Sequence, residues 1–138
     1  MEPPQSTPQP AATPAPTGRK ILIIEDEHFI SELYIRALTR AGYDVTAEVD
    51  GQRGMDLAKT DQFDIILLDL MVPTITGIEV LRRLRGPGSK PLKAKIIITT
   101  NLEQREETRA DIESQADAYL VKAEITPREL VEFLNTIK

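Results

Sequence analysis

The feature of this sequence that most limits its fold is a regular alternation of short strand-like runs with stretches of helical spacing. Five strand-like runs occur in order: KILIIED, YDVTAEV, residues 63–68, residues 95–99 and ADAYLVK. Nearly continuous apolar strands that alternate with helices indicate a parallel sheet covered by helices on both faces. The sequence therefore predicts an α/β fold of three layers, α/β/α, built as a doubly wound (βα)5 unit.

The segments between these runs carry recognisable helix signals. Helical patterns cover residues 29–41, 51–59, 78–84 and 103–115 and the segment after Ile125. The fourth pattern is strongly polar, and Ile112 is almost its only apolar anchor. The last begins with TPRE, in which Thr126 is the predicted N-cap and Glu129 completes a capping box.

Proline supplies six of the first 18 residues, and Met1 is the only large apolar residue there. Such a segment cannot bury enough surface to offset the entropy of ordering it. We therefore predict a disordered, partly polyproline-like tail over residues 1–18 and a single folded domain over residues 19–138.

Charge and composition exclude several classes of function. A net charge of −5 argues against direct binding of nucleic acid, which needs a concentrated basic face. The absence of cysteine excludes disulfides, thiolate metal sites and a cysteine nucleophile. No apolar stretch approaches the roughly 20 residues of a membrane span, and the N-terminus lacks the pattern of a signal peptide. We therefore expect a cytoplasmic protein without membrane contact.

Acidic residues stand at the ends of two predicted strands: Glu25 and Asp26 after the first, and Asp69 after the third. In a sheet of order 2-1-3-4-5 these strands are neighbours, and ligands bind at their carboxyl ends. Two carboxylates about 4 Å apart repel by roughly 4 kcal/mol at an effective dielectric near 20. Mg²⁺, a hard cation that prefers oxygen ligands, would compensate this repulsion. Helix capping is the simpler explanation for each acid alone, but it does not explain their coincidence.

Two further side chains reach the same edge of the sheet. Thr100 closes the fourth strand and Lys122 the fifth. With Asp69 as nucleophile, Mg²⁺ bridging phosphate oxygens, and Thr100 and Lys122 binding the others, the set resembles a phosphoryl-transfer site. Such chemistry needs mainly positioning and charge neutralisation.

Residues 19–138 resemble a response-regulator receiver domain, the phospho-accepting part of bacterial two-component signalling, which has the flavodoxin-like fold of CheY. The matching motifs are IIEDE, DLMVPTITG and ADAYLVKA, in the family's order and spacing. The resemblance implies phosphorylation of Asp69 by a sensor histidine kinase or a phosphotransfer protein. It also implies autophosphorylation and autodephosphorylation with Mg²⁺ and no other enzymatic activity.

The resemblance assigns roles to individual residues. Asp26, Asp69 and the Met71 backbone carbonyl would ligate Mg²⁺, and Glu25 would act through water. Thr100 would swing toward the phosphate, and Tyr119 would follow it inward.

The resemblance also implies partners. The last strand and the two helices beside it, around Tyr119 and Glu124, would form the face for a downstream protein or a homodimer. The sequence ends with the last predicted helix, so we expect either a stand-alone receiver or a piece of a longer protein.

Thr99 and Thr100 compete for the switch position. Spacing from Lys122 favours Thr100, and spacing from Asp69 favours Thr99. The loop GPGSKPLKAK can absorb an extra residue, whereas the polar helix before the fifth strand cannot do so without rotating its faces. We therefore take Thr100.

The sequence departs from the family pattern around the site. Ala123 follows Lys122 where the family usually has Pro, which argues against the usual cis bond, since a non-proline cis bond costs about 3 kcal/mol. Asn101 replaces a small residue and would crowd the entry to Asp69. Met71 and Leu102 place apolar groups where hydrolytic water would approach, so we expect slow loss of the phosphoryl group.

Other functions are compatible with the same fold. An aspartyl phosphatase would need a second Asp two residues after the nucleophile, and Met71 stands there. A nucleotide or flavin carrier would need a Gly- or Ser/Thr-rich loop after the first strand, and IEDEHF stands there. A binding module that works without phosphate stays open. His28, the only histidine, is expected at the surface or rim, so the phosphodonor histidine would belong to a partner.

Overall fold

A computed structural model of the chain describes residues 18–101 and 106–137. Its elements, in chain order, are β1 (Lys20–Ile24), α2 (His28–Arg40), β2 (Asp44–Glu48), α3 (Gly51–Ala58), β3 (Ile65–Asp69), α4 (Gly77–Arg85), β4 (Lys95–Thr100), α5 (Glu106–Gln115), β5 (Ala118–Val121), the 3-10 helix η1 (Lys122–Glu124) and α6 (Pro127–Asn135). The predicted tail, Gly18 excepted, lies outside the described residues. So do Leu102 and the first part of the predicted polar helix.

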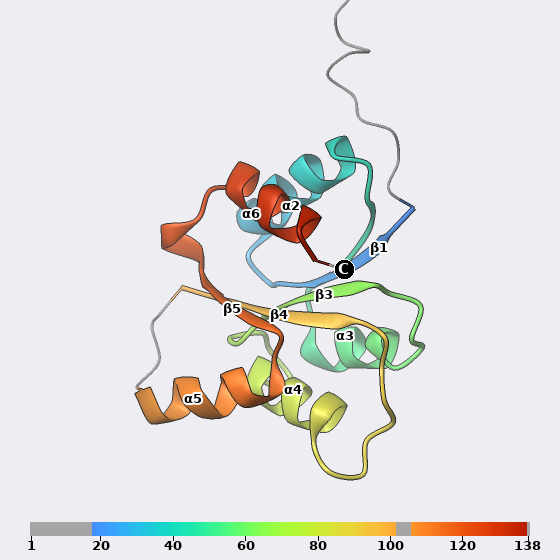
Figure 1. Cartoon of the computed structure of the whole chain (residues 1–138), viewed down its shortest axis with the longest axis vertical. Coiled ribbons are helices and arrows are strands. Elements are labelled where there is room, and N and C mark those ends of the chain that lie inside the picture. Colours follow the sequence, from blue (N-terminus) through green and yellow to red (C-terminus); the bar gives the residue numbers. More distant parts are fainter. Residues whose placement is uncertain (1–17, 102–105, 138) are drawn as a thin grey trace, which may run out of the picture.

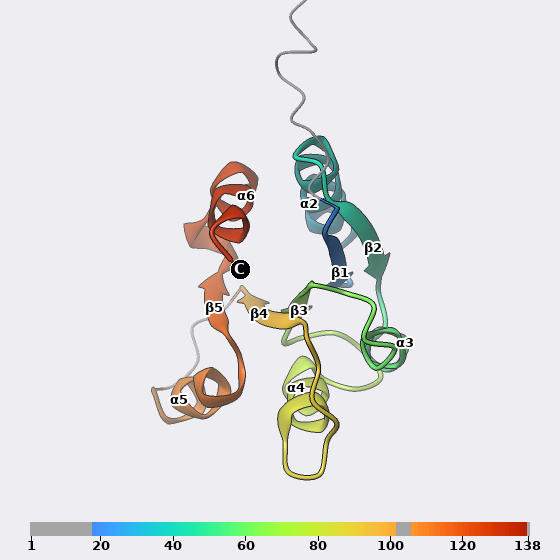
Figure 2. The same ribbon diagram turned by 45° about the vertical axis from the view of Figure 1, so that its right-hand side comes forward.

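The strands form one parallel sheet in the order β2-β1-β3-β4-β5. Helices α2 and α6 cover one face of this sheet, and α3, α4 and α5 cover the other (Figure 1, Figure 2). The predicted three-layer, doubly wound fold is therefore confirmed, including its strand order.

Two apolar clusters lie on the two faces of the sheet. Alternate residues of β1 and β3 enter different clusters: Ile21 and Ile65 pack with α2 and α6, whereas Leu22 and Ile66 pack with α3, α4 and α5. Both faces of each central strand are thus buried, which explains the continuous apolar runs in the sequence. None of the helices in the described part of the chain is long and apolar enough to cross a membrane.

Most predicted helix signals are confirmed. Thr126 accepts a hydrogen bond from the Glu129 N–H at 3.0 Å, and the Glu129 carboxylate accepts one from the Thr126 N–H at 2.9 Å. Ile112, a residue of α5, is buried in the core, as predicted for the main apolar anchor of that polar helix.

The third strand begins two residues later than predicted. Asp64 precedes β3, and its side chain accepts a hydrogen bond from the Lys20 N–H at 2.8 Å. The Asp64 N–H also donates to the Lys20 carbonyl at 2.8 Å, so this side-chain bond adds to the backbone pairing just before the strand. Phe63 is nevertheless buried in the core, so its apolar character reports burial and not strand conformation.

Gly77 allows α4 to begin directly against the end of β3. A Cβ atom at this position would lie 2.2 Å from the Asp69 carbonyl oxygen and 2.6 Å from the Leu70 Cα. These are backbone atoms, so the strand end itself would have to move. Gly77 thus helps to fix where β3 stops and where its last residue lies.

We predict that Gly77→Ala lowers the free energy of unfolding by about 1–3 kcal/mol, because the added methyl overpacks this contact. Urea denaturation measures the change. Glu132→Gln, an exposed change on α6, serves as the control and should alter stability by no more than about 0.5 kcal/mol. Equal stability of Gly77→Ala and the wild-type protein would contradict the close packing described here.

Candidate functional site

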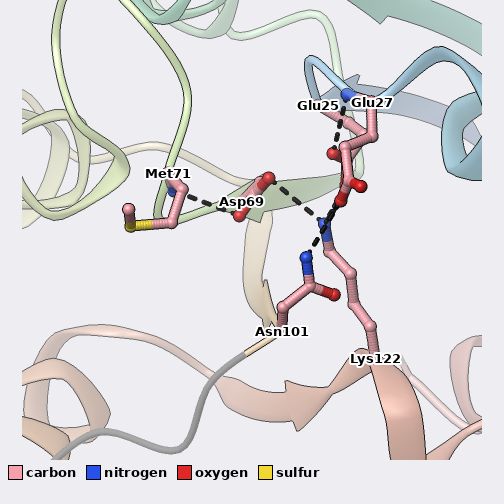
Figure 3. Close-up of polar contacts among 6 residues, drawn as sticks. All are labelled: Glu25, Glu27, Asp69, Met71, Asn101 and Lys122. Atoms are coloured by element: carbon pink, nitrogen blue, oxygen red, sulfur yellow. Dashed lines mark hydrogen bonds and ion pairs between the residues drawn. The ribbon is translucent and has the colours of Figure 1, made fainter.

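Three charged side chains from three strand ends meet at the carboxyl edge of the sheet (Figure 3). The Lys122 ammonium lies 3.1 Å from Asp69 Oδ2 and in direct contact with Glu25 Oε1. Glu25, Asp69 and Lys122 are only 2%, 3% and 7% exposed. The predicted convergence of these residues is therefore present, and it is buried.

The sheet order explains the meeting. β1 and β3 are paired with Ile24 opposite Leu68. The next residue of each chain segment, Glu25 after β1 and Asp69 at the end of β3, therefore lies at the same level of the sheet. β5 is separated from β3 by β4, so the side chain of Lys122 must reach across the end of β4. The long lysine side chain makes this possible where a shorter cationic residue would fail.

Glu27 joins this group, which the sequence did not lead us to expect. Carboxylate oxygens of Glu25, Glu27 and Asp69 lie within 4.8 Å of one another. Glu27 Oε1 lies 3.5 Å from the Lys122 ammonium and accepts a hydrogen bond from Asn101 Nδ2 at 3.0 Å. Glu27 is the N-cap residue of α2, but its side chain makes no capping hydrogen bond. The only sequence signal for its place in this group is its position two residues after Glu25.

Asp26 is exposed and does not belong to that group of three carboxylates. The structure thus brings Glu25 and Asp69 together, as predicted. The third carboxylate beside them is that of Glu27 and not that of Asp26. The Glu27 N–H donates to Glu25 Oε2 at 3.1 Å, so the N-cap residue of α2 is held against the buried carboxylate. The role of Asp26 as a metal ligand stays a prediction.

Burial and charge perturb the acid–base behaviour of this cluster. Burial is the largest effect on Glu25 and, opposed by the hydrogen bond to Lys122, raises the pKa of its carboxyl to about 7. Burial alone would lower the pKa of the Lys122 ammonium, but the Glu25 hydrogen bond and the Asp69 charge outweigh it and raise that pKa. Lys122 therefore stays charged and compensates the carboxylates around it.

The chemistry of the donor set fits a hard divalent cation. Carboxylate oxygens from two strand ends and one helix start converge within 4.8 Å, and Mg²⁺ prefers such oxygen ligands. The Met71 carbonyl belongs to the loop that follows Asp69. Mg²⁺ is therefore compatible with the residues present at this edge.

Asp69 also forms a local turn with the residue two positions on. Its Oδ1 accepts a hydrogen bond from the Met71 N–H at 3.1 Å. It does not cap α4, because Thr76 accepts from the Glu79 N–H there. The side chain of Met71 is 64% exposed beside the site.

Thr99 and Thr100 are both buried, but strand alternation places them on opposite faces. Thr99 pairs with Asp69 in the sheet register. Thr100 pairs with Val121 and shares the face on which Val121 and Tyr119 are buried. This shared face is what a coupling between Thr100 and Tyr119 would require, and the choice of Thr100 stays a prediction.

Two remaining expectations concern the peptide bond after Lys122 and the position of His28. Every peptide bond in the described residues is trans, including the bond between Lys122 and Ala123. His28 is exposed at the start of α2, as expected for a rim residue.

The raised pKa of Glu25 predicts how stability depends on pH. The pKa of about 7 lies above the ordinary 4.5 of an unfolded chain. The stabilising contribution is therefore complete below pH 4.5 and is lost as the pH rises through 7. In buffer with a chelator, we predict that the free energy of unfolding falls between pH 5 and pH 8 and that Glu25→Gln makes this fall smaller.

Urea denaturation at the two pH values measures the effect. Glu27→Gln removes the same charge from a half-exposed position and should keep most of the wild-type pH dependence. Identical pH dependence in Glu25→Gln and the wild-type protein would show that Glu25 does not titrate as described.

Comparisons with known proteins agree with this geometry. A family model described as the response regulator receiver domain matches residues 21–135. The response regulator ArlR of Staphylococcus aureus is 38% identical over 119 residues, which cover 86% of this chain and 51% of the relative. This chain therefore spans about half the length of the curated relatives that it matches.

Solved structures show the same similarity. The receiver domain of the Francisella response regulator 1452 has a TM-score of 0.75 at 28% identity, covering 86% of this chain and 95% of that one. The BeF3-activated N-terminal receiver domain of Klebsiella pneumoniae RstA has a TM-score of 0.71 at 28% identity, covering 85% and 96%.

Proposed function

This chain belongs to the response-regulator receiver family of two-component signalling, and from this we propose that Asp69 accepts a phosphoryl group from a partner histidine kinase or phosphotransfer protein. The phosphorylated form would then change a contact with a downstream protein. The observation that supports this best is the buried ammonium of Lys122 in contact with both Asp69 and Glu25.

The proposed step is a direct phosphoryl transfer. An Asp69 carboxylate oxygen attacks the phosphorus atom, an O–P bond forms, and the N–P bond to the partner's imidazole breaks. The imidazole nitrogen keeps the electron pair of the broken bond. Lys122, 3.1 Å from Asp69 Oδ2, orients the carboxylate and offsets the negative charge of the arriving phosphoryl oxygens.

Mg²⁺ belongs to this proposal, with Glu25, Asp26, Asp69 and the Met71 carbonyl as the groups that would hold it. When bound, the ion would neutralise charge between these carboxylates and the phosphoryl oxygens. Glu27 is the additional carboxylate that the geometry brings to the same place.

The proposed switch uses Thr100, Tyr119 and α5. Phosphate on Asp69 would draw the Thr100 hydroxyl toward it, and Tyr119 would follow on the same face of the sheet. α5 packs on the core through Ile112, and few apolar anchors suit an element that must move. Tyr119 is only 8% exposed, with the Arg109 guanidinium 4.5 Å from its ring centroid.

The proposed output face is formed by α5, β5 and α6. A hollow of about 270 Å³ lies on it, lined by Arg109, Tyr119, Leu120, Val121, Glu124, Ile125 and Glu129. A downstream protein or a second copy of the chain would bind here. We further propose a cytoplasmic protein that binds no nucleic acid through this domain and has no enzymatic activity beyond its own phosphorylation and dephosphorylation.

Intact-mass spectrometry after incubation with acetyl phosphate tests the proposed chemistry. We expect one phosphoryl adduct that requires Mg²⁺ and is absent from Asp69→Asn. Asp26→Asn tests the role of Asp26. If Asp26 is a ligand, this variant should need a higher Mg²⁺ concentration than the wild-type protein to reach the same rate of phosphorylation. An adduct that persists in Asp69→Asn would refute the assignment, and no adduct in the wild-type protein would favour a binding module that works without phosphate.

Slow loss of the phosphoryl group is a separate prediction. Met71 is exposed beside Asp69 and offers no polar group to orient a hydrolytic water. Met71→Asn combined with Leu102→Glu should speed dephosphorylation by about tenfold, because polar side chains would position that water. The decay of the adduct by mass spectrometry measures the rate.

Val49→Asn, the same kind of change at another exposed apolar residue, is the control for that comparison. It should leave the decay rate unchanged. An unchanged rate in the Met71 and Leu102 variant would show that these side chains do not limit access of water.

A further inference from the structure

The loop over residues 70–76 joins β3 to α4 and adjoins the candidate phosphoacceptor. Its residue Met71 donates its N–H to Asp69 Oδ1 at 3.1 Å. The far end of the loop is closed by the Gly77 N–H, which donates to the Leu70 carbonyl at 3.0 Å. The geometry of the middle of this loop therefore bears on the position of the Asp69 carboxylate.

The backbone at the middle of the loop is strained. Thr74 has a φ of 74°, in the left-handed region that β-branched residues rarely adopt. A conformation of this kind persists only where surrounding contacts hold it.

Those contacts come from the start of α3. Asp50, the N-cap residue of α3, accepts a hydrogen bond from the Arg53 N–H at 2.9 Å through Oδ2. Its other oxygen, Oδ1, accepts one from the Thr74 hydroxyl. The next residue, Gly51, donates its N–H to the Pro73 carbonyl at 3.0 Å. Two loops are thus joined side chain to side chain and backbone to backbone.

The two loops lie too close for any side chain at residue 51. A Cβ atom on Gly51 would lie 2.1 Å from the Ile75 carbonyl oxygen. The loops follow β2 and β3, which flank β1 and do not pair with each other. The contact therefore links the loop after β2 directly to the loop after β3, across the end of β1.

We propose that Asp50 is a positioning residue for the phosphoacceptor: its bond to Thr74 holds the loop after β3 so that Met71 stays in place beside Asp69. Capping of α3 explains only one of its two carboxylate oxygens. The bond to the Thr74 hydroxyl, together with the cap, also lowers the pKa of Asp50, so the carboxylate stays ionised at neutral pH.

Substitutions can separate the cap from the link to the loop. Ser is as good an N-cap as Asp, but it has one oxygen on a shorter side chain, so Asp50→Ser keeps the cap and loses the link. Thr74→Val removes the same link from the other side without touching α3. Asp50→Asn can cap through its oxygen and donate its amide N–H to the Thr74 oxygen, and should rescue function.

The first measurement is amide hydrogen exchange by NMR, which needs neither metal nor phosphate. We expect the Met71 amide to exchange about tenfold faster in Asp50→Ser and in Thr74→Val, with no further increase in the double variant. Thr46→Val, the same chemical change on β2, should leave this exchange unchanged, and so should Asp50→Asn.

The second measurement, the rate of phosphorylation by acetyl phosphate with Mg²⁺, rests on the proposed function. We expect a loss of about tenfold in the two variants that lack the link, with a weaker apparent Mg²⁺ affinity. Wild-type exchange at Met71 in both variants would overturn the positioning role. If the wild-type protein is not phosphorylated, the proposed function fails and hydrogen exchange alone decides the role of Asp50.

Discussion

The contact on which the site depends is the one between the buried Lys122 ammonium and the carboxylates of Glu25 and Asp69. Two carboxylates held together away from water destabilise a fold unless a cation compensates them. Lys122 supplies that charge and comes from a strand that does not pair with either of theirs. Its removal would leave an acidic cluster without its internal counterion, so stability and proposed function depend on the same contact.

The rest of the architecture places this contact at one edge of the sheet. The apolar runs of β1 and β3 are buried on both faces, which fixes the two strands as neighbours with their carboxyl ends level. Gly77 then lets α4 start against the last residue of β3, and the link between Asp50 and Thr74 secures the loop in between. Packing of the strands and loops around the charges thus determines how closely the charges approach one another.

Sequence patterns predicted the fold well because they reported burial. Alternation of apolar strands and helices gave the layers, and the TPRE motif gave the start of α6 with its capping box. Phe63 misled us about the start of β3 because a buried residue before a strand looks like part of it. The convergence of Glu25, Asp69 and Lys122 was also predictable, since strand ends in such sheets share an edge.

What the sequence did not reveal depends on local backbone geometry. The backbone N–H of Glu27 is bonded to the Glu25 carboxylate, and no periodicity in the sequence reports such a local contact. The link from Asp50 to Thr74 joins residues of two separate loops. Thr74 has a left-handed backbone there, and a threonine in the sequence does not predict that conformation. Both features lie at the carboxyl edge, where the chain runs between regular strands and helices.

The most direct test of the central claim is an NMR titration of the ¹⁵N-labelled protein with beryllofluoride and Mg²⁺, a stable mimic of the phosphoryl group. If Lys122 and the carboxylates form a phosphoryl-accepting site, the amides of Met71, Thr100 and Tyr119 should shift together and saturate, and Asp69→Asn should show none of these changes. The absence of shifts in the wild-type protein, or equal shifts in Asp69→Asn, would contradict the account.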